Sequence, residues 1–575
     1  MFRAICNREF RELFERCTPP QGWPQKLAIA NSGGPDSTCL LFLLRRFLQE
    51  SEGIAFPKSL VSLTVDHCLQ EASSAMADHC SRTSTSLGIE HVTAAIPWSH
   101  PPFPHKPSRS FEKIARTARY HLLFNAMSEV GSTAIAFGHH ADDQIETALL
   151  RSAKGSTEFG AAGMRPCRRW GMGFGNGEGS LGWAGIEGMR RWIVRPLLTV
   201  PKSRILATCE ENGLEYVMDP TNFQPEITVR NTIRHILSRN PEYDDNPGPL
   251  KEAELATNAI SPGECSTNGN SVTSNALQLP ARFSLDISLG RAHLHTVVKT
   301  LSERRQQVDD VATQNIGECR RVSPPSTVLL VPYLLRPTAD AVIQRAMILR
   351  IMRYVSFYPW GSLQAEAHRR TESLNQIIGK VLCSAPETFP KPFVAGGGVL
   401  WTPVFLMENG QFKISKSEDK HIGSTSCSSL PAAWIASRQP PFAKSLSDTR
   451  TSTRKDALHL NITHLIGEKV DGVNPQEEQE LLWDCRFLLR INGRRLKTTV
   501  DRARSITGSE DGELLLEPET RWYLPRIVWR WTGGSIVLAR MMWSRSSRTT
   551  KKPLVHIFDQ DDFVSIQDAR VLDTL

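Results

Sequence analysis

The six residues from Ser32 to Ser37 have the sequence Ser-Gly-Gly-Pro-Asp-Ser, which combines two hydroxyls, two adjacent glycines and one carboxylate. Adjacent glycines let the main chain approach phosphate oxygens, and the N-terminus of a following helix adds about half a positive charge. A carboxylate beside phosphates is favourable only when a cation lies between them, so Asp36 predicts a Mg²⁺ ion. Glycine-rich turns also occur where nothing binds. The lack of a Gly-Lys-Ser/Thr ending excludes a Walker A loop.

A second group of chemically active side chains follows Gly138 and comprises His139, His140, Asp142, Asp143 and Glu146. Asp143 and Glu146 are three residues apart, so they lie on one face of the helix expected to begin here. Two adjacent aspartates exceed what a helix cap needs. Histidines and carboxylates this close together would also suit a transition metal, so a metal hydrolase is one alternative.

Charged residues at helical spacing occupy the stretch after Ser110, which is expected to cap a helix. Glu112, Arg116, Arg119 and Tyr120 fall on one broad face of that helix. From spacing alone, a solvated face with charge pairs is the simplest interpretation.

Strand and helix patterns alternate around these residues. Strands are predicted at residues 27–30, 59–65, 88–92 and 133–137, and helices begin near residues 38, 72 and 110. This alternation predicts an α/β fold with a doubly wound parallel sheet. Ligands of such sheets bind at the carboxyl ends of the strands, so the Asp36 loop and Asp66-His67 should share an edge.

The hexapeptide from Ser32 to Ser37 resembles the SGGxDS signature of the N-type ATP pyrophosphatases, or PP-loop ATPases. The block from His139 to Thr147 is similar to the HHxDDQxET block of tRNA(Ile)-lysidine synthetases. Further stretches resemble blocks of the same family in the same order, at residues 112–120, 155–156, 163–166, 195–198, 219–222 and 230–234. The chain departs from the family pattern at Gln70, Lys154 and a glycine-rich insertion at residues 171–188.

The resemblance implies an ATP-dependent ligase that acts on the CAU anticodon of tRNA(Ile) with free L-lysine. Adenylation of C2 of the wobble cytidine would be followed by replacement of AMP with lysine, giving lysidine. The implied ATP-binding residues are Ser32, Gly33, Gly34, Pro35, Asp36 and Ser37. The implied catalytic residues are Asp36, Asp143 and Glu146, with Asp36 and Asp143 as Mg²⁺ ligands. Lysine or phosphate groups would be bound by Glu112, Arg116, Arg119, His140, Asp143 and Glu146.

Two alternatives stay open beside this function. One is another PP-loop tRNA-modifying enzyme such as a 2-thiolase, although the twelve cysteines form no C-x-x-C pair, which also disfavours a zinc or iron–sulfur site. The other is a non-catalytic RNA-binding relative. A homodimer is an option for its assembly.

The length of 575 residues predicts several domains. A PP-loop catalytic domain is expected at 1–240, a disordered linker at 241–285 and a mainly helical tRNA-contacting region at 286–414. A disordered insertion at 415–460 and a basic, β-containing domain at 461–575 with a role in tRNA binding complete the expected organisation.

The C-terminal part interleaves basic and aromatic residues. Arg486, Arg490, Arg494, Arg495 and Lys497 form one group, and Trp522, Trp529, Trp531 and Trp543 alternate with Arg526, Arg530, Arg540 and Arg545. Such residues suit RNA. A β-domain with a tryptophan core and solvated arginines explains the same pattern equally well.

Composition excludes few functions. A formal net charge of +8 is consistent with an anionic partner such as RNA. No apolar run reaches the length of a membrane span. The N-terminal residues predict a short amphipathic helix with Phe10, Leu13 and Phe14 inward rather than a presequence. Long low-complexity insertions look eukaryotic, and for a eukaryotic protein the family resemblance implies a mitochondrial location; otherwise the cytoplasm is expected.

Overall fold

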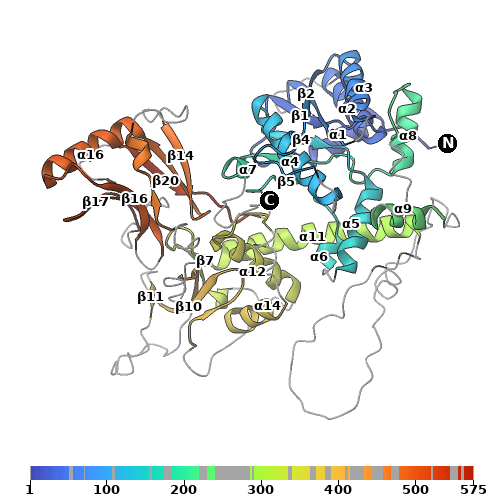
Figure 1. Ribbon diagram of the computed structural model, residues 1–575. Coiled ribbons are helices and arrows are strands. Elements are labelled where there is room, and N and C mark those ends of the chain that lie inside the picture. The colour runs from blue at the N-terminus through green and yellow to red at the C-terminus, as the bar shows by residue number, and fades with distance from the viewer. Residues whose placement is uncertain are drawn as a thin grey trace, which may run out of the picture. The chain divides into compact units, whose positions relative to one another are not determined.

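The computed structural model divides the chain into two compact units, the first comprising residues 1–169 and 190–307 and the second residues 170–189 and 308–574 (Figure 1). Within them the structure describes residues 2–50, 56–69, 72–106, 111–154, 158–173, 184–218, 229–239, 285, 287, 290–334, 340–362, 365, 371–382, 390–407, 412–414, 433–441, 458–467, 478–519, 522–543, 554–557 and 562–573. In these residues no helix combines the length and apolar character needed to cross a membrane.

The first unit is built on a six-stranded sheet with the order β3-β2-β1-β4-β6-β5. Its strands are β1 (Lys26–Ala30), β2 (Ser59–Asp66), β3 (Glu90–Ala95), β4 (Ala134–Phe137), β5 (Cys167–Arg169) and β6 (Trp192–Val194). Five strands are parallel, and only β5 at the edge runs antiparallel to its neighbour. The predicted α/β fold with a parallel sheet is confirmed.

Helices cover this sheet as the alternating pattern predicts (Figure 1). They are α1 (Asn7–Glu15), α2 (Pro35–Glu50), α3 (Ala72–Ser86), α4 (Phe111–Glu129) and α8 (Lys202–Glu211), whereas the short helix α7 (Glu187–Arg190) belongs mainly to the second unit. Phe10, Leu13 and Phe14 of α1 are buried, which confirms the inward face predicted for this helix. They share one core with apolar residues of α2 and with Ile205 of α8, because these faces carry the apolar stripe.

A second group of helices in the first unit surrounds the acidic stretch. It comprises α5 (Ala141–Ala153), α6 (Glu158–Ala161), α9 (Val229–Arg239) and the first part of α11 (Arg291–Cys319). Ile145 and Leu149 of α5 pack in one buried cluster with Ile233 of α9 and Leu294 of α11. This packing fixes the direction in which the first turn of α5 faces.

The second unit contains three largely antiparallel sheets with the orders β11-β10-β12-β8-β7, β13-β16-β17-β18-β19 and β14-β15-β20, with β9 paired to β10. Its helices include α12 (Ala341–Val355), α14 (Thr371–Ile377) and α16 (Gly493–Thr507), and short helical turns lie at Pro332–Leu334, Ile378–Leu382 and Thr463–Ile466. The strands are β7 (Arg320–Arg321), β8 (Val328–Leu330), β9 (Phe393–Val394), β10 (Val399–Leu406), β11 (Phe412–Ile414), β12 (Ala433–Arg438), β13 (Leu460–Asn461), β14 (Glu478–Trp483), β15 (Phe487–Asn492), β16 (Glu513–Glu519), β17 (Leu524–Trp531), β18 (Gly534–Met542), β19 (Leu554–Ile557) and β20 (Val564–Asp568). The β-containing C-terminal part is confirmed, and the range 286–414 contains strands as well as helices.

Strand β12 corrects one expectation. The segment 415–460 was expected to be disordered, but Ala433–Arg438 within it forms a strand between β10 and β8 in which every residue is buried. Because six apolar-rich residues stand between long Ser- and Pro-rich stretches, composition averaged over the segment hides the strand. The rest of this segment, apart from residues 439–441 and 458–460, and most of the linker at 241–285 lie outside the described residues.

Some of the C-terminal arginines and tryptophans are engaged inside the fold, whereas others are exposed. Trp529 is fully buried, as the interpretation with a tryptophan core expects. Arg486 is fully buried too, and its Nε lies 2.6 Å from Asp484 Oδ2. Arg526 and Arg530 both donate to Glu517. Arg486 therefore does not belong to a basic surface, and Arg545 lies outside the described residues.

Candidate active site

The glycine-rich loop connects β1 to α2 in a conformation that requires glycine. Gly33 has a φ of +74°, a left-handed conformation that side chains with a Cβ rarely adopt. A Cβ at this position would also lie only 3.1 Å from Cys80 Sγ on α3. Helix α2 begins at Pro35, earlier than the apolar pattern predicts, because proline fits the first helical position and Asp36 and Ser37 complete the first turn.

Hydrogen bonds inside the loop decide which backbone groups face outward. The Ser32 N–H donates to Ser37 Oγ at 3.1 Å, and the Gly33 N–H donates to Asn31 Oδ1 at 3.0 Å. Within the described part of the chain, the N–H groups of Gly34, Asp36 and Ser37 make no hydrogen bond. These three donors lie at the N-terminus of α2, where the helix dipole favours an anion.

Asp36 forms an ion pair that the sequence did not predict. Its Oδ1 lies 2.5 Å from Nζ of Lys202, the first residue of α8, and the two side chains are 31% and 28% exposed. Lys202 follows β6 at the same edge of the sheet as the loop. The position of Lys202 after a strand that ends at this edge was the sequence signal for placing it near the loop. Spacing along the chain gives no reason to pair it with Asp36, because the two residues are far apart in the sequence.

The start of α5 lies directly against the loop. Gly138 leaves no room for a side chain, because a Cβ there would lie 2.8 Å from the backbone carbon and oxygen of Asp36. The next residues therefore pass close to the first turn of α2. His140 caps α5, accepting the Asp142 N–H at Nδ1 (3.2 Å), while the Asp143 carboxylate accepts the His140 N–H at 3.0 Å.

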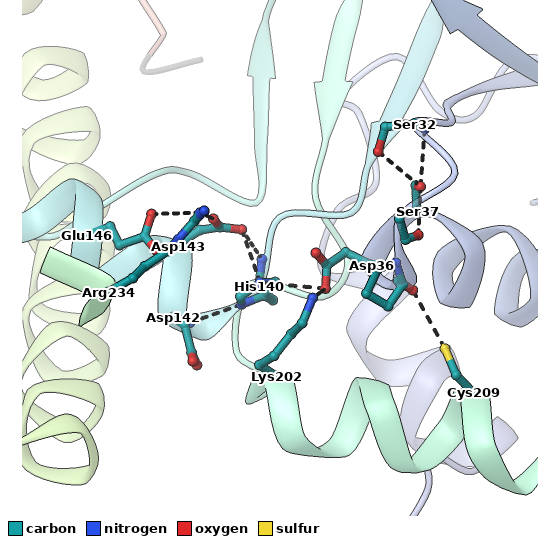
Figure 2. Close-up of polar contacts among 12 residues, drawn as sticks. Ser32, Asp36, Ser37, His140, Asp142, Asp143, Glu146, Lys202, Cys209 and Arg234 are labelled. Carbon is teal, nitrogen blue, oxygen red and sulfur yellow. Dashed lines mark hydrogen bonds and ion pairs between the residues drawn. The ribbon is translucent and has the colours of Figure 1, made fainter. Parts of the chain in front are cut away.

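His140 brings two predicted site residues together, as Figure 2 shows. Its Nε2 lies 3.6 Å from Asp36 Oδ1 and 3.6 Å from Asp143 Oδ2, so these oxygens are separated by at most twice that distance. Burial alone raises the pKa of Asp143, but the charges of His140 and His139 outweigh it and leave this pKa below its ordinary value. Asp143 is therefore ionised at neutral pH.

Arg234 of α9 neutralises the acidic face of α5 (Figure 2). Its Nε and Nη2 donate to the two oxygens of Glu146 at 2.5 and 3.1 Å, and its Nη2 lies 3.6 Å from Asp143 Oδ1. The Glu146 side chain is only 3% exposed, and burial raises its pKa against the opposing effect of Arg234. A cationic ligand at these carboxylates would have to share or replace the Arg234 guanidinium.

Two other polar residues of the same block have structural partners. Asp142 faces α11, with Oδ1 3.0 Å from His295 Nε2 and Oδ2 3.4 Å from Arg291 Nη1. Gln144 accepts the Met164 N–H and donates to the Met164 carbonyl. Asp142, the aspartate beyond what the cap needs, thus joins α5 to α11.

A basic cluster lies on the other side of His139. Tyr120 stacks on Phe137 at 5.5 Å, and Arg116 Nη2 donates to the Tyr120 hydroxyl at 3.3 Å. Burial alone raises the pKa of Tyr120, but the charges of Arg116 and Arg195 leave it below its ordinary value. Burial, with the nearby charge of Arg168, lowers the pKa of Arg195 to about 10.

Arg119 belongs to the same cluster, and burial together with the charge of Arg116 lowers its pKa. The face is therefore not the solvated one that spacing suggested, and repelling cations this close together favour an anion between them. Glu112 is a residue of α4, but its side chain lies outside the described residues, as do residues 155–156 and 219–222, Gln70, and 174–183 of the insertion.

The donor set bears on which metal the site suits. Among the described residues, no group of three or more His, Cys, Asp or Glu side chains is arranged to hold a metal ion. Two carboxylates, Asp36 and Asp143, fit Mg²⁺, which takes one or two protein carboxylates and completes its shell with water and phosphate oxygens.

Comparison with known proteins defines the class of the first unit. Residues 3–240 match the family model of the PP-loop domain. This part of the chain is therefore a PP-loop domain, the class that the loop and the parallel sheet indicate.

The relatives narrow this class. The chain is 33% identical over 238 residues to the tRNA(Ile)-lysidine synthase of Methylobacterium nodulans and 34% identical over 245 residues to that of a Bradyrhizobium species. These matches cover 41% and 43% of this chain and 60% of each relative. In this part the chain is similar to tRNA(Ile)-lysidine synthases.

The match spans about three fifths of the length of these relatives. The relatives named here are bacterial, so they give no support to a mitochondrial location. Among solved structures, a U34-tRNA thiolase from Methanococcus maripaludis aligns with 41% of this chain and 74% of its own, at 16% identity and a TM-score of 0.30. An overlap this small does not bear on the function.

Proposed function

We propose that this protein is an ATP-dependent ligase that converts the wobble cytidine in the CAU anticodon of tRNA(Ile) into lysidine. The observation that carries the proposal is the convergence of the loop carboxylate and the α5 carboxylate on His140, with Asp36 and Asp143 each 3.6 Å from its Nε2. A nucleotide site and an acidic amine site are thereby adjacent. The match of residues 3–240 to the PP-loop domain and the similarity to tRNA(Ile)-lysidine synthases support the same chemistry.

The loop residues bind the pyrophosphate end of ATP in this proposal. The N–H groups of Gly34, Asp36 and Ser37 donate to phosphate oxygens, while Ser32 and Gly33 maintain the shape of the turn. Asp36 and Asp143 are the residues that would hold Mg²⁺. When bound, the ion supplies positive charge that offsets the negative charge developing on the transferred phosphate.

The reaction proceeds in two displacements. The C2 oxygen of cytidine attacks the α-phosphorus, the bond to the β-phosphate oxygen breaks, and pyrophosphate leaves. The amine of lysine then attacks C2, and the C2–O bond breaks with release of AMP, since a carbonyl oxygen is a poor leaving group until it carries AMP. The free lysine binds with its amine near Asp143 and Glu146, displacing Arg234 from part of its contact.

The anionic ends of the substrates go to the basic cluster in this proposal. Arg116 and Arg119 bind the lysine carboxylate or a phosphate, and Arg195 adds a third charge to the same group. A 2-thiolase is the less favoured alternative, because the cysteines near the loop, Cys39 of α2 and Cys209 of α8, are buried. The regions 286–414 and 461–575, which lie mostly in the second unit, contact the tRNA.

The test compares Asp36→Ala with Asp78→Ala, which removes an exposed carboxylate on α3. Pyrophosphate release from ATP is measured with and without lysine and a tRNA(Ile) transcript bearing CAU, and the tRNA nucleosides are analysed by mass spectrometry. We expect wild type and Asp78→Ala to form lysidine only when lysine is present. Asp36→Ala should lose about a hundredfold or more of the rate, because a group that handles charge in the transition state is removed, while tRNA binding persists.

Two results would refute the proposal. The first is lysidine formation by Asp36→Ala at the wild-type rate. The second is a wild-type protein whose pyrophosphate release does not depend on lysine and yields no lysidine.

A further inference from the structure

Asn31 is a buried polar residue at the junction between β1 and the glycine-rich loop, and it is only 4% exposed. Both ends of its amide are engaged. Oδ1 accepts the Gly33 N–H at 3.0 Å and lies 3.2 Å from the Ser37 hydroxyl. Nδ2 donates to Ser62 Oγ at 3.2 Å and lies 3.5 Å from Ser84 Oγ. The amide thus links the loop to β2 and α3.

The surroundings hold this amide in one orientation. Ser62 and Ser84 are fully buried, and Ser62 Oγ in turn lies 3.0 Å from His91 Nδ1 on β3. The Asn31 backbone is fixed as well, because its N–H donates to the Leu63 carbonyl and its carbonyl accepts the Thr64 hydroxyl. The amide therefore cannot rotate without leaving buried donors and acceptors unpaired, which is unfavourable.

The contact to Gly33 has a direct consequence for the loop. A side-chain oxygen that accepts the N–H two residues later forms a tight turn, and here the turn contains Gly33 in its left-handed conformation. That turn uses the Gly33 N–H internally. The donors of Gly34, Asp36 and Ser37 are then the ones presented at the helix N-terminus.

Few side chains could replace this amide. Leucine has nearly the same shape but neither donor nor acceptor, and aspartate keeps the acceptor for Gly33 but loses the donor to Ser62. Only an amide of this length satisfies the loop and the buried serines at once.

We propose that Asn31 is a positioning residue of the phosphate-binding loop, which holds the Gly33 turn so that three backbone donors are preset for pyrophosphate. This inference rests on the proposed function of the loop as the ATP site. Asn31 does not touch the substrate. It acts through Gly33 and Ser37, and its effect belongs to the affinity for ATP rather than to the handling of tRNA.

The experiment must separate positioning from ordinary stabilisation. Asn31→Leu removes both hydrogen-bonding ends at nearly constant volume, and Asn31→Asp restores only the acceptor. Thr64→Val is the matched control, because it removes a buried hydroxyl that contacts the Asn31 backbone and leaves the amide intact. For the full-length proteins, ATP affinity is measured by calorimetry, KM and kcat by pyrophosphate release, and stability by thermal unfolding.

We expect Asn31→Leu to weaken ATP binding and raise the KM for ATP about tenfold or more, since preset donors are lost. Its KM for tRNA stays unchanged. Asn31→Leu and Thr64→Val lower the melting temperature by similar amounts, because each removes a buried hydrogen-bonding group. Thr64→Val nevertheless keeps the ATP affinity within about twofold. Asn31→Asp recovers part of the lost affinity.

An Asn31→Leu protein that folds and binds ATP like wild type overturns this inference alone. A wild-type protein that binds no ATP overturns the proposed function and the inference with it. If Asn31→Leu does not fold, Ser62→Ala decides, because it frees the amide to rotate: weaker ATP binding supports the inference, and unchanged binding overturns it.

Discussion

At the residue level, the ion pair between Lys202 and Asp36 places an ammonium group on the carboxylate that is proposed to hold Mg²⁺. An ammonium group and Mg²⁺ cannot hold the same oxygen at once, and Lys202 Nζ lies 2.5 Å from Asp36 Oδ1. When a nucleotide and its cation arrive, Lys202 must release this oxygen. Its nearest new partner is then a phosphate group beside the loop, for which a flexible lysine is well suited.

The first prediction concerns this lysine. Lys202→Ala should cost about 1 kcal/mol or less of folding free energy, because both side chains of the pair are roughly a third exposed. The KM for ATP should rise about tenfold, since a charge-assisted donor is lost beside the triphosphate. Thermal unfolding and initial rates of pyrophosphate release measure the two effects, with Lys202→Arg as the variant that keeps the charge. An unchanged KM for ATP in Lys202→Ala would show that this lysine does not contact the bound nucleotide.

The contacts that a motif predicts and those found only in the structure differ in one physical respect. Ser32, Ser37 and Asp36 lie within one short turn, so their proximity could be predicted from the sequence. Lys202 is separated from Asp36 by 166 positions, and Arg234 from Glu146 by 88. Such pairs depend on how helices pack on the sheet, and no local pattern encodes them.

At the level of secondary-structure elements, α5 is fixed by polar contacts on two sides. Asp142 joins it to Arg291 and His295 of α11. Gln144 joins it to the backbone of Met164, which Arg305 of α11 also contacts at 3.1 Å. Only the side of α5 that bears Asp143 and Glu146 faces the loop residues and α9, so the helix can present its carboxylates without moving.

The second prediction tests this attachment. Asp142→Ala should destabilise the first unit by about 1–3 kcal/mol, because it leaves Arg291 and His295 without their carboxylate. Glu303→Ala is the control, since Glu303 is an exposed acid on the same helix α11. Thermal unfolding should show a lower melting temperature for Asp142→Ala only. The KM for ATP, measured in parallel, should stay near the wild-type value. Equal melting temperatures for the two variants would mean that Asp142 does not hold α11.

The predictability of the elements followed their regularity. Strands β1 to β4 and the helices that begin near residues 38, 72 and 110 were predictable because buried parallel strands alternate with amphipathic helices, whereas the three-residue strands β5 and β6 were not predicted. Strand β12 was not, because its six residues, Ala433–Arg438, acquire their partners β10 and β8 from distant parts of the chain. Its burial results from its place between β10 and β8 in the sheet, and the sequence around these six residues does not encode that place.

At the level of the whole molecule, the second unit separates buried from exposed positive charge. Arg438 and Arg486 share Asp484, at 2.7 and 2.6 Å, in a fully enclosed cluster. Breaking such a cluster is costly, so these arginines belong to the fold. The exposed cations gather instead on the outer face of α16, whose buried face is formed by Leu496, Val500 and Ala503.

The basic face of α16 is the surface of the second unit that best suits the proposed tRNA substrate. It comprises the exposed residues Arg494, Arg495, Lys497 and Arg502, opposed by one exposed acid, Asp501. Cations on one helix face match the spacing of a phosphate backbone and bind it without reading its sequence. Arg490 differs from these residues, because its Nε lies 2.8 Å from Glu480 Oε1 and its charge is already paired.

The last prediction uses this contrast between α16 and its neighbouring strand. Lys497→Gln should weaken tRNA binding and reduce the slope of log affinity against log salt by about one, because one phosphate contact and its released counterion are lost. Arg490→Gln removes an equal charge that Glu480 neutralises, so its affinity and slope should stay near wild type. Filter binding of the tRNA(Ile) transcript over a range of salt concentrations measures both. Identical salt slopes for Lys497→Gln and wild type would remove α16 from the tRNA-binding surface, whereas a loss shared by both variants would indicate only a dependence on overall charge.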